Sequence, residues 1–457
     1  MLRRILALFA EAPLVAPLAD SELVAARYRR TRTRVLFGSM VAYGLFYFCR
    51  KNLSIALPLL SRDLGYSNVE LGLLGSALYV TYGISKFGSG LLADRAHPRA
   101  FMLVGLLLSA AVNICFGLSS SLVVFAALWA VNGVLQSTGA PASAKILATW
   151  FSAHERGTKT AIWNISHQGG GGLVLIVAGL FAAEFGWRGA FIGPALLAIV
   201  GGLLVARFLR DRPESEGLPP IEVYCHETQA HGDASEQTLP ARQLIVRYVL
   251  CNRRVWLVAL ASCCTYVVRY GALDWSPKYL AEVRHVSIGG AGLLSSLLEI
   301  VGIPGALLCG WLSDRVFATR RAPVVLISLV LLAGSVLLLY LVPGGHPGLD
   351  ALLLGCIGFF TYGPQMLLAG VSPVDVSSRR VAAAAVGFTG LVSYVGATVS
   401  SALTGVLLDT SGWAAAFHFW AAAALAGALL CIPLWRESAV VKMADATPAP
   451  AGVAALT

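Results

Sequence analysis

The feature that most constrains this chain is a series of twelve long apolar stretches, most of them separated by short connections. A helix needs about 20 mainly apolar residues to cross a bilayer. Only 13% of the residues are charged, whereas soluble proteins usually carry about 25%. A soluble core stops growing near ~300 residues, so a larger core does not explain this deficit. The sequence therefore predicts an all-α membrane protein with twelve transmembrane helices, surrounded by lipid.

The predicted spans form two groups of six on either side of one long polar segment. The spans run roughly over 35–58, 69–93, 101–118, 122–148, 160–183 and 189–209, and then over 255–280, 288–311, 323–343, 350–372, 381–408 and 412–435. The expected organisation is an N-terminal segment 1–34, a first six-helix half 35–209, a linker 210–254, a second half 255–435 and a tail 436–457.

Basic residues predict the orientation of these spans. Most of the 34 lysines and arginines lie at the N-terminus, in or beside the even-numbered connections, or in the tail. The odd-numbered connections hold only Arg62, Arg188, Lys278 and Arg284. Because cytoplasmic loops are enriched in lysine and arginine, both termini and the linker are predicted to be cytoplasmic.

Composition also argues against several functions. The net charge is +10, but the basic residues lie in short loops rather than on one soluble face, so nucleic acid is not an expected partner. The nine cysteines are scattered and have no metal-ligand spacing, so neither a metal nor a cofactor is expected. The spans contain no nucleophile beside a base and no carboxylate cluster, which argues against an enzyme.

A repeated loop motif links the two halves. Residues 90–95 read Gly-Leu-Leu-Ala-Asp-Arg, and residues 310–315, 220 positions later, read Gly-Trp-Leu-Ser-Asp-Arg. Such a repeat indicates two halves with a shared fold, and the motif resembles the signature of the major facilitator superfamily. We expect these loops, including Asp94, Arg95, Asp314 and Arg315, to have structural or gating roles. A carboxylate near a helix end can accept hydrogen bonds from a neighbouring helix N-terminus and lock two helices together.

Two arginines within the spans are the main candidates for a binding site. Arg50 lies in the first span and Arg269 near the middle of the seventh, so pseudosymmetry predicts that they face each other. An arginine at a helix centre costs ~2.5–3.5 kcal/mol on insertion scales, and such residues are functional by default. A guanidinium matches phosphate in charge and geometry, so the pair predicts a site for a dianion. The alternative is that the arginines pair internally with Glu299 and Asp274.

Other charged or titratable residues in the spans are weaker candidates. Lys51 is expected to extend outward to the interface, and Lys145 lies near a span end, whereas Lys86 fits either a structural or a binding role. His167 precedes the four glycines 169–172, which would let a substrate approach the helix closely. Its titration near neutral pH is a physical reason to expect a role in binding.

Four motifs stand out: Arg50-Lys51-Asn52, Tyr82–Phe87, Trp163–His167 and Arg269–Pro277. They resemble the organophosphate:phosphate antiporters. The stretches 217–222, 302–305, 307–311, 362–364 and 387–391 resemble that family's bacterial glycerol-3-phosphate transporters in particular. The resemblance covers about 25–436 and implies alternating-access exchange of a small organophosphate, glycerol 3-phosphate first, for inorganic phosphate. It also implies a monomer in the bacterial inner membrane.

The resemblance implies roles at matching positions. Arg50 and Arg269 would grip phosphate, and Glu299 and Asp274 would belong to networks between helices. The residues that would assist binding or line the pocket are His167, Lys86, Asn164, Tyr43, Tyr47, Tyr266, Tyr362 and Tyr394.

The sequence departs from the family in places that bear on the substrate. Hexose-phosphate carriers show an acid and a lysine in the eleventh span, where this chain has Val386 and Thr389. The stretch 42–48, however, is similar to the family's hexose-phosphate sensor. A hexose-6-phosphate transporter, or a sugar-phosphate sensor with a signalling partner, therefore stays open as an alternative.

Overall fold

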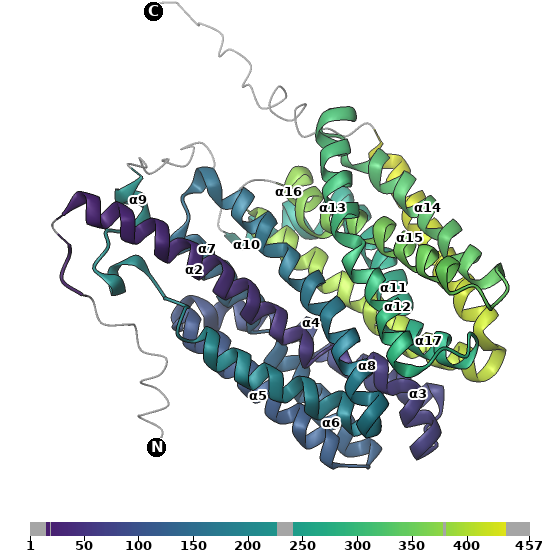
Figure 1. Cartoon of the computed structure of the whole chain (residues 1–457). Helices are drawn as coiled ribbons and strands as arrows, with labels where there is room; N and C mark the ends of the chain where they lie inside the picture. Colours follow the sequence, from purple (N-terminus) through teal and green to yellow (C-terminus); the bar gives the residue numbers. More distant parts are fainter. Residues whose placement is uncertain (1–14, 19, 226–240, 378–380, 436–457) are drawn as a thin grey trace, which may run out of the picture.

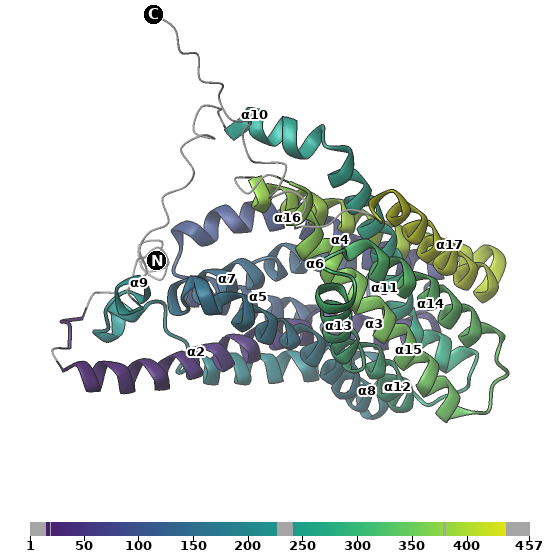
Figure 2. The ribbon, with the colours of Figure 1, turned by 90° about the horizontal axis from the view of Figure 1, so that it is seen from above.

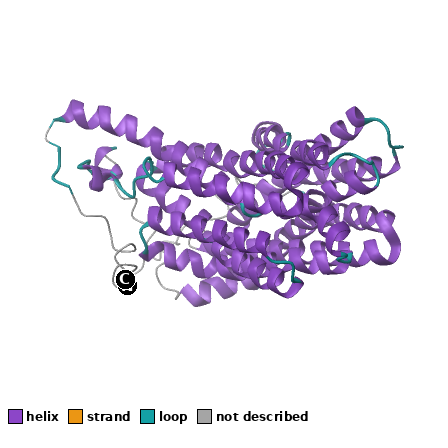
Figure 3. Ribbon diagram, turned by 60° about the horizontal axis from the view of Figure 1, so that its bottom comes forward, coloured by secondary structure: helices purple, strands orange, loops and turns teal. Residues whose placement is uncertain are grey.

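The structure, a computed structural model, describes residues 15–18, 20–225, 241–377 and 381–435. The side chains of a few helical residues, including Asp94 and Arg95, are outside this description. Within the described ranges the chain forms helices and contains no strand (Figure 3).

The first half contains seven helices, several of which are parts of the same span. They are α2 (Ser21–Phe48), α3 (Asn52–Leu64), α4 (Asn68–Arg95), α5 (Pro98–Leu118), α6 (Leu122–Gln136), α7 (Gly139–Trp150) and α8 (Ala153–Val205). The connection to the second half contains a 3-10 turn (Pro213–Glu216), α9 (Ile221–Tyr224), α10 (Ala241–Ile245) and a π-helical turn (Val246–Leu250).

The second half repeats this arrangement. Its helices are α11 (Arg253–Glu282), α12 (Ile288–Ile300), α13 (Gly302–Trp311), α14 (Arg321–Leu341), α15 (Pro347–Met366), α16 (Ser372–Val376) and α17 (Ala382–Cys431). Shorter turns continue three of them, namely π-helical Leu312–Val316 and Leu367–Val371 and 3-10 Ile432–Leu434.

Helices α8 and α17 are each a pair of spans joined by a sharp bend. The 53 residues of α8 would extend ~80 Å if straight, more than twice the ~30 Å hydrocarbon core. Gly186 breaks α8 with a φ of +65°, which glycine adopts without steric cost. After the bend the chain runs back, so that a Cβ on Gly193 would lie 2.4 Å from the Phe181 ring.

The same bend divides α17, where Gly412 has a φ of +73°. Trp420 donates to the Thr404 hydroxyl at 3.0 Å, although a straight helix would separate these residues by ~24 Å. Each long helix is therefore a hairpin of two spans, as the sequence predicts.

These bends account for the number of spans. Among the described residues, eight helical stretches are long and apolar enough to cross a membrane, and two of them are the bent helices. The other two spans are α2–α3, which the turn Cys49–Lys51 interrupts, and α4, which is less apolar. The predicted all-α fold with two six-helix halves is confirmed.

The two halves lie side by side, α2–α8 on one side and α11–α17 on the other (Figures 1 and 2). Their main contacts join α4 to α17 and α8 to α12. Both of these interfaces need small residues. A Cβ on Gly72 would lie 2.5 Å from the Ser401 carbonyl oxygen, and a Cβ on Gly292 would lie 2.3 Å from the Leu175 carbonyl oxygen. Small residues let membrane helices approach this closely.

A polar contact joins the two halves at the end of the bundle farthest from the linker. There Asp409 of α17 caps α4, because its carboxylate accepts from the Asn68 side chain at 2.7 Å and from the Val69 backbone N–H at 2.8 Å. The opposite end of α4 is next to the linker, where the Arg99 backbone N–H donates to Asp211 at 2.9 Å. The two halves are thus joined by a polar contact at the far end.

The first part of the linker packs on the first half. Tyr28 donates to the Pro219 carbonyl and stacks on Tyr224 with ring centroids 4.1 Å apart, and Trp150 donates to the Arg210 carbonyl at 3.0 Å. Burial raises the pKa of the Tyr28 phenol above its usual value, so the hydroxyl stays protonated as a donor. Residues 226–240 of the predicted linker lie outside the described part.

Candidate functional site

The site begins at a break in the first span. Helix α2 ends at Phe48 and α3 starts at Asn52, so Cys49, Arg50 and Lys51 form a turn inside the bundle. The Arg50 and Lys51 backbone N–H groups both donate to the Tyr47 carbonyl, at 3.1 and 3.0 Å. Arg50 is 5% exposed and Lys51 is 2% exposed. The turn therefore carries two buried cations toward the second half.

Arg50 reaches across to the second half and lies among tyrosines. Its Nη2 donates to the hydroxyls of Tyr394 at 3.1 Å and Tyr270 at 3.3 Å. The guanidinium carbon lies 4.3 Å from the centroid of the Tyr82 ring, in the range of a cation–π contact. These partners come from α4, α11 and α17, so the Arg50 side chain lies at the interface between the halves.

Arg269 occupies the matching place on α11. Its Nη2 donates to the Tyr362 hydroxyl at 3.1 Å, and this hydroxyl in turn donates to the Glu299 carboxylate. A Glu299 oxygen lies 4.0 Å from Nη2, which is long for a direct ion pair. Glu299, one of the two possible internal partners, thus lies near Arg269 and is connected to it mainly through Tyr362.

Tyr270 brings the two arginines into one cluster. It accepts from Arg50 through its hydroxyl and lies with its ring centroid 5.1 Å from the Arg269 guanidinium. The Nε atoms of both arginines are buried and have no hydrogen-bond partner among the described residues. Two buried guanidiniums from opposite halves therefore keep unused donors in one cluster, as expected from the pseudosymmetry.

The position of Lys51 contradicts the prediction that its side chain extends outward to the membrane interface. Instead of extending to the interface it forms an ion pair with Asp274 of α11 at 2.6 Å, and both side chains are buried. Asp274 also accepts from the Tyr79 hydroxyl and lies 3.5 Å from the Ser54 hydroxyl. The break after Phe48 turns Lys51 inward, which a continuous helix would not do. Asp274 thus pairs with a lysine rather than with either arginine.

The described cluster carries an excess of positive charge. Its cations are Arg50, Lys51, Lys86 and Arg269, and its carboxylates are Asp274 and Glu299. Three buried cations against two buried carboxylates leave one positive charge in the interior of the bundle, and the exposed Lys86 adds a second at the edge of the cluster. Buried charge is costly unless it is paired, so the cluster is suited to an anion with two negative charges.

The structure brings two of the three candidate assisting residues next to this cluster. The His167 ring lies between tyrosines of both halves, with centroids 6.1 Å from Tyr47 and 6.0 Å from Tyr362. Lys86 is exposed, and its Nζ lies 5.8 Å from the Tyr394 ring centroid. The Asn164 side chain is exposed on α8, one helical turn before His167, and the Asn164 backbone is hydrogen-bonded to the His167 ring.

The glycines after His167 serve helix packing more than substrate access. A Cβ on Gly170 would lie 2.5 Å from the Gly44 carbonyl oxygen of α2, and one on Gly171 would lie 2.9 Å from the Glu299 carboxyl carbon. Gly169 alone of the four faces open space. The expectation that all four glycines let a substrate approach the helix is therefore wrong for Gly170, Gly171 and Gly172, which neighbouring helices contact instead.

The candidate tyrosines are all buried near the arginines, except that Tyr43 is farther away. Tyr43 packs on Trp163 with centroids 4.6 Å apart, and Tyr266 lies 5.6 Å from Tyr394. Sequence reasoning missed Tyr79, Tyr82 and Tyr270 as contacts of the charged groups. Their positions gave a signal, because Tyr79 and Tyr82 share a helix face with Lys86 and Tyr270 follows Arg269.

The charged side chains of the repeated loop motif are described only in the second half. Asp314 pairs with Arg321, the first residue of α14, and Arg321 also binds Asp375 of α16 at 3.1 Å. Arg315 is exposed. The side chains of Asp94 and Arg95 lie outside the described residues, so their expected roles stay predictions.

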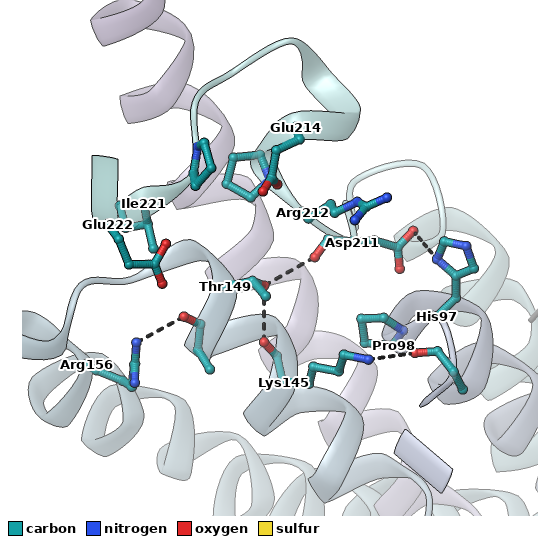
Figure 4. A pocket seen from close by; sticks show the side chains of 14 residues that line it. His97, Pro98, Lys145, Thr149, Arg156, Asp211, Arg212, Glu214, Ile221 and Glu222 are labelled. Atoms are coloured by element: carbon teal, nitrogen blue, oxygen red, sulfur yellow. Dashed lines mark hydrogen bonds and ion pairs between the residues drawn. The ribbon is translucent and has the colours of Figure 1, made fainter. Parts of the chain in front are cut away.

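A cavity of about 530 Å³ lies at the linker end of the first half, away from the arginines (Figure 4). Lys145 lines it and donates to the carbonyls of Ala93 and Ala96 at 2.9 and 3.0 Å. His97 and Asp211 pair across it at 3.3 Å. Lys145 thus caps the end of α4, in keeping with a structural role. A cavity of only about 20 Å³ lies beside Arg50.

The bent twelve-span bundle with a charged site between its halves defines a membrane transporter fold. Residues 39–401 match the family model described as Major Facilitator Superfamily, and the chain belongs to this family. A solved structure of a bacterial homologue of the human lysosomal transporter Spinster shares the fold, with a TM-score of 0.69, 15% identity and coverage of 92% of this chain and 99% of that one.

Similar proteins assign the chain to a smaller group within this superfamily. The chain is 39% identical to a probable hexose phosphate transport protein of Chlamydia pneumoniae, over 93% of this chain and 95% of the relative. It is 39% identical to the glycerol-3-phosphate transporter of Bacillus subtilis, over 90% and 93%. It is also 38% identical to the membrane sensor protein UhpC of Escherichia coli, over 93% and 97%. The predicted resemblance to the organophosphate:phosphate antiporters is confirmed, and these relatives are transporters or sensors rather than enzymes.

Proposed function

We propose that this protein exchanges a small organophosphate for inorganic phosphate across the bacterial inner membrane. The observation that carries the proposal is the pairing of Arg50 and Arg269, which come from opposite halves and contact the same Tyr270. A phosphoryl group between them would use the donors that remain, since guanidinium binds phosphate through paired hydrogen bonds. His167, Lys86 and Asn164 would assist, and the surrounding tyrosines would line the pocket.

The charge of the cluster supports exchange rather than one-way movement. Four cations and two carboxylates leave two positive charges, which a phosphate dianion would neutralise. Without the anion, the facing cations resist closer approach of the halves, because like charges repel strongly where the dielectric is low. The empty protein would therefore change conformation slowly, and a bound anion would be needed in each direction. This is alternating access around a fixed site.

Glycerol 3-phosphate is the substrate that we favour. The wall at Val386 and Thr389 offers little to a hexose, because Val386 is apolar and half-buried and Thr389 is a single buried hydroxyl. A three-carbon phosphate has fewer hydroxyls to satisfy. The glycerol-3-phosphate transporter of Bacillus subtilis and the hexose phosphate protein of Chlamydia pneumoniae are equally similar to this chain at 39% identity, so similarity does not choose between them.

A second candidate function is sensing of a sugar phosphate. It is favoured by the 38% identity to UhpC of Escherichia coli, a membrane sensor protein. A sensor would need a signalling partner to read its state, and a histidine-kinase gene next to its own would support this candidate. As a transporter the protein would act as a monomer, with both termini and the linker in the cytoplasm.

Transport by purified protein in vesicles tests the proposal. Vesicles loaded with phosphate should take up labelled phosphate, glycerol 3-phosphate or both, and protein-free vesicles measure the leak. A protein that binds a sugar phosphate with normal affinity but carries neither compound would favour the sensor.

A further inference from the structure

A buried network of amide side chains surrounds the break in the first span. The Cys49 carbonyl, in the turn between α2 and α3, accepts from the side chains of Asn132 at 2.7 Å and Asn113 at 3.0 Å. The Phe46 carbonyl, one turn earlier, accepts from the Gln136 side chain at 3.0 Å. Carbonyls at a helix end lose their helical partners, and side chains of α5 and α6 supply donors here. The Phe46 carbonyl accepts in addition from the Cys49 backbone N–H at 3.2 Å.

The amides also hold one another in place. Gln136 donates to Ser109 at 2.7 Å, and Ser109 donates to Asn132 at 2.5 Å. Asn113 accepts from Asn52, the first residue of α3, at 2.9 Å. All five side chains are at most 2% exposed. Of these five side chains, Asn52 keeps a buried oxygen without a partner among the described residues. In a low-dielectric interior such a connected polar network is rigid, and loss of one member leaves other members unpaired.

Within the part of the second half that the structure describes, no such network lies at the corresponding place. Helix α11 runs unbroken through Arg269, so its carbonyls keep their helical partners. Helix α14, the counterpart of α5, contains no asparagine or glutamine. Helix α15, the counterpart of α6, holds one amide, Gln365, whose buried Oε1 has no partner among the described residues. The connected amide network is therefore found beside the interrupted span.

We infer that Asn113, Asn132 and Gln136 are positioning residues for Arg50 and Lys51, an inference that rests on the proposed function. Both cations follow Cys49 in the turn and contact α11 or α17 of the second half, whereas the amides come from α5 and α6. The amides fix the Cys49 and Phe46 carbonyls, and the fixed turn in turn aims both cations at the second half. Without these donors the turn relaxes toward other hydrogen bonds, and the cations leave the geometry that binds phosphate.

The test is equilibrium binding of inorganic phosphate to the purified full-length protein. The variant Asn132→Leu keeps the approximate volume but removes the donor to Cys49, and we expect the Kd for phosphate to rise about tenfold, equivalent to ~1.4 kcal/mol. Gln136→Leu provides a second variant that leaves both Cys49 donors in place, with a smaller expected rise. Ser143→Ala is the matched control, since Ser143 is buried in the same half and bonds only within α7 and to Met102.

A double-mutant cycle separates positioning from general destabilisation. If Asn132 acts through Arg50, adding Asn132→Leu to the Arg50→Lys variant should change the Kd for phosphate little. Adding it to the Arg269→Lys variant should still raise the Kd about tenfold. An equal loss in both backgrounds would overturn the inference and leave the proposed function intact. If Arg50→Lys alone leaves phosphate affinity unchanged, the arginine clamp itself is wrong, and the positioning inference is overturned with it.

Discussion

Lys51 and Asp274 form a buried ion pair of 2.6 Å that joins the two halves of the protein. Lys51 lies in the turn of the first span and Asp274 lies in the unbroken α11. Any movement that separates the halves at this level must break the pair or carry it along. Breaking a buried pair leaves an uncompensated charge, so this contact couples the arrangement of the halves to the charge balance of the binding cluster.

The ion pair predicts the effects of neutral substitutions on stability. Lys51→Met or Asp274→Leu alone should lower the free energy of unfolding by about 3–5 kcal/mol, because each leaves one buried charge unpaired. The double variant should recover most of this loss, since replacing both charges by apolar groups is often nearly neutral. Thermal unfolding in detergent measures this, and a double variant as unstable as the sum of the singles would contradict the coupling.

The arginine clamp predicts that Arg50→Lys and Arg269→Lys each abolish exchange of labelled phosphate. The charge is kept, but lysine offers a point charge instead of a planar fork. Arg188→Lys is a matched control, because Arg188 is exposed in a connection and contacts Ser120 at 3.0 Å, and it should exchange normally. Near-normal exchange by either clamp variant would show that the paired geometry is not required.

The excess positive charge predicts that exchange is obligatory. Vesicles loaded with phosphate should accumulate labelled phosphate from outside, whereas unloaded vesicles should take up almost none. Repulsion between the unneutralised cations is the expected barrier to the empty return step. Equal initial rates in the two preparations would show that the protein returns freely without an anion.

The side chains of Val386 and Thr389 predict a preference for a three-carbon phosphate over a hexose phosphate. Glycerol 3-phosphate should compete with labelled phosphate better than glucose 6-phosphate does, by about tenfold to a hundredfold. This corresponds to ~1–3 kcal/mol for each hydroxyl left without a partner. Competition curves for the two compounds decide the matter, and tighter binding of glucose 6-phosphate would reverse the assignment.

The glycine run predicts opposite effects at neighbouring positions. Gly171→Ala places a methyl group against the Glu299 carboxylate and should destabilise the protein by about 1–3 kcal/mol. Gly169→Ala meets nothing within 4 Å and should stabilise α8 by about 0.5–1 kcal/mol. Thermal unfolding of both variants tests this, and similar melting temperatures would show that Glu299 moves aside at little cost.

Much of the site could be recognised without the structure because intramembrane charge is rare and costly. Arg50 and Arg269 stood out on this ground, and their equal depth in the two halves indicated that they face one another. Tyr362 and Tyr394, given by resemblance, do contact these arginines. The same reasoning failed for Lys51, because it assumed a continuous helix through Arg50. Adjacent residues on such a helix point 100° apart, whereas the turn after Phe48 sends both cations toward the second half.

The sequence by itself determined the twelve spans, their two repeated halves and the arginines at the centre. These features follow from local quantities, namely the length of apolar runs, the spacing of repeats and the cost of charge in lipid. Only the tertiary structure decided that Lys51 pairs with Asp274, that Gly171 makes room for Glu299, and that buried amides hold the turn at Cys49. Those contacts join residues far apart in the chain, and helix packing, which no local pattern encodes, sets which side chains meet.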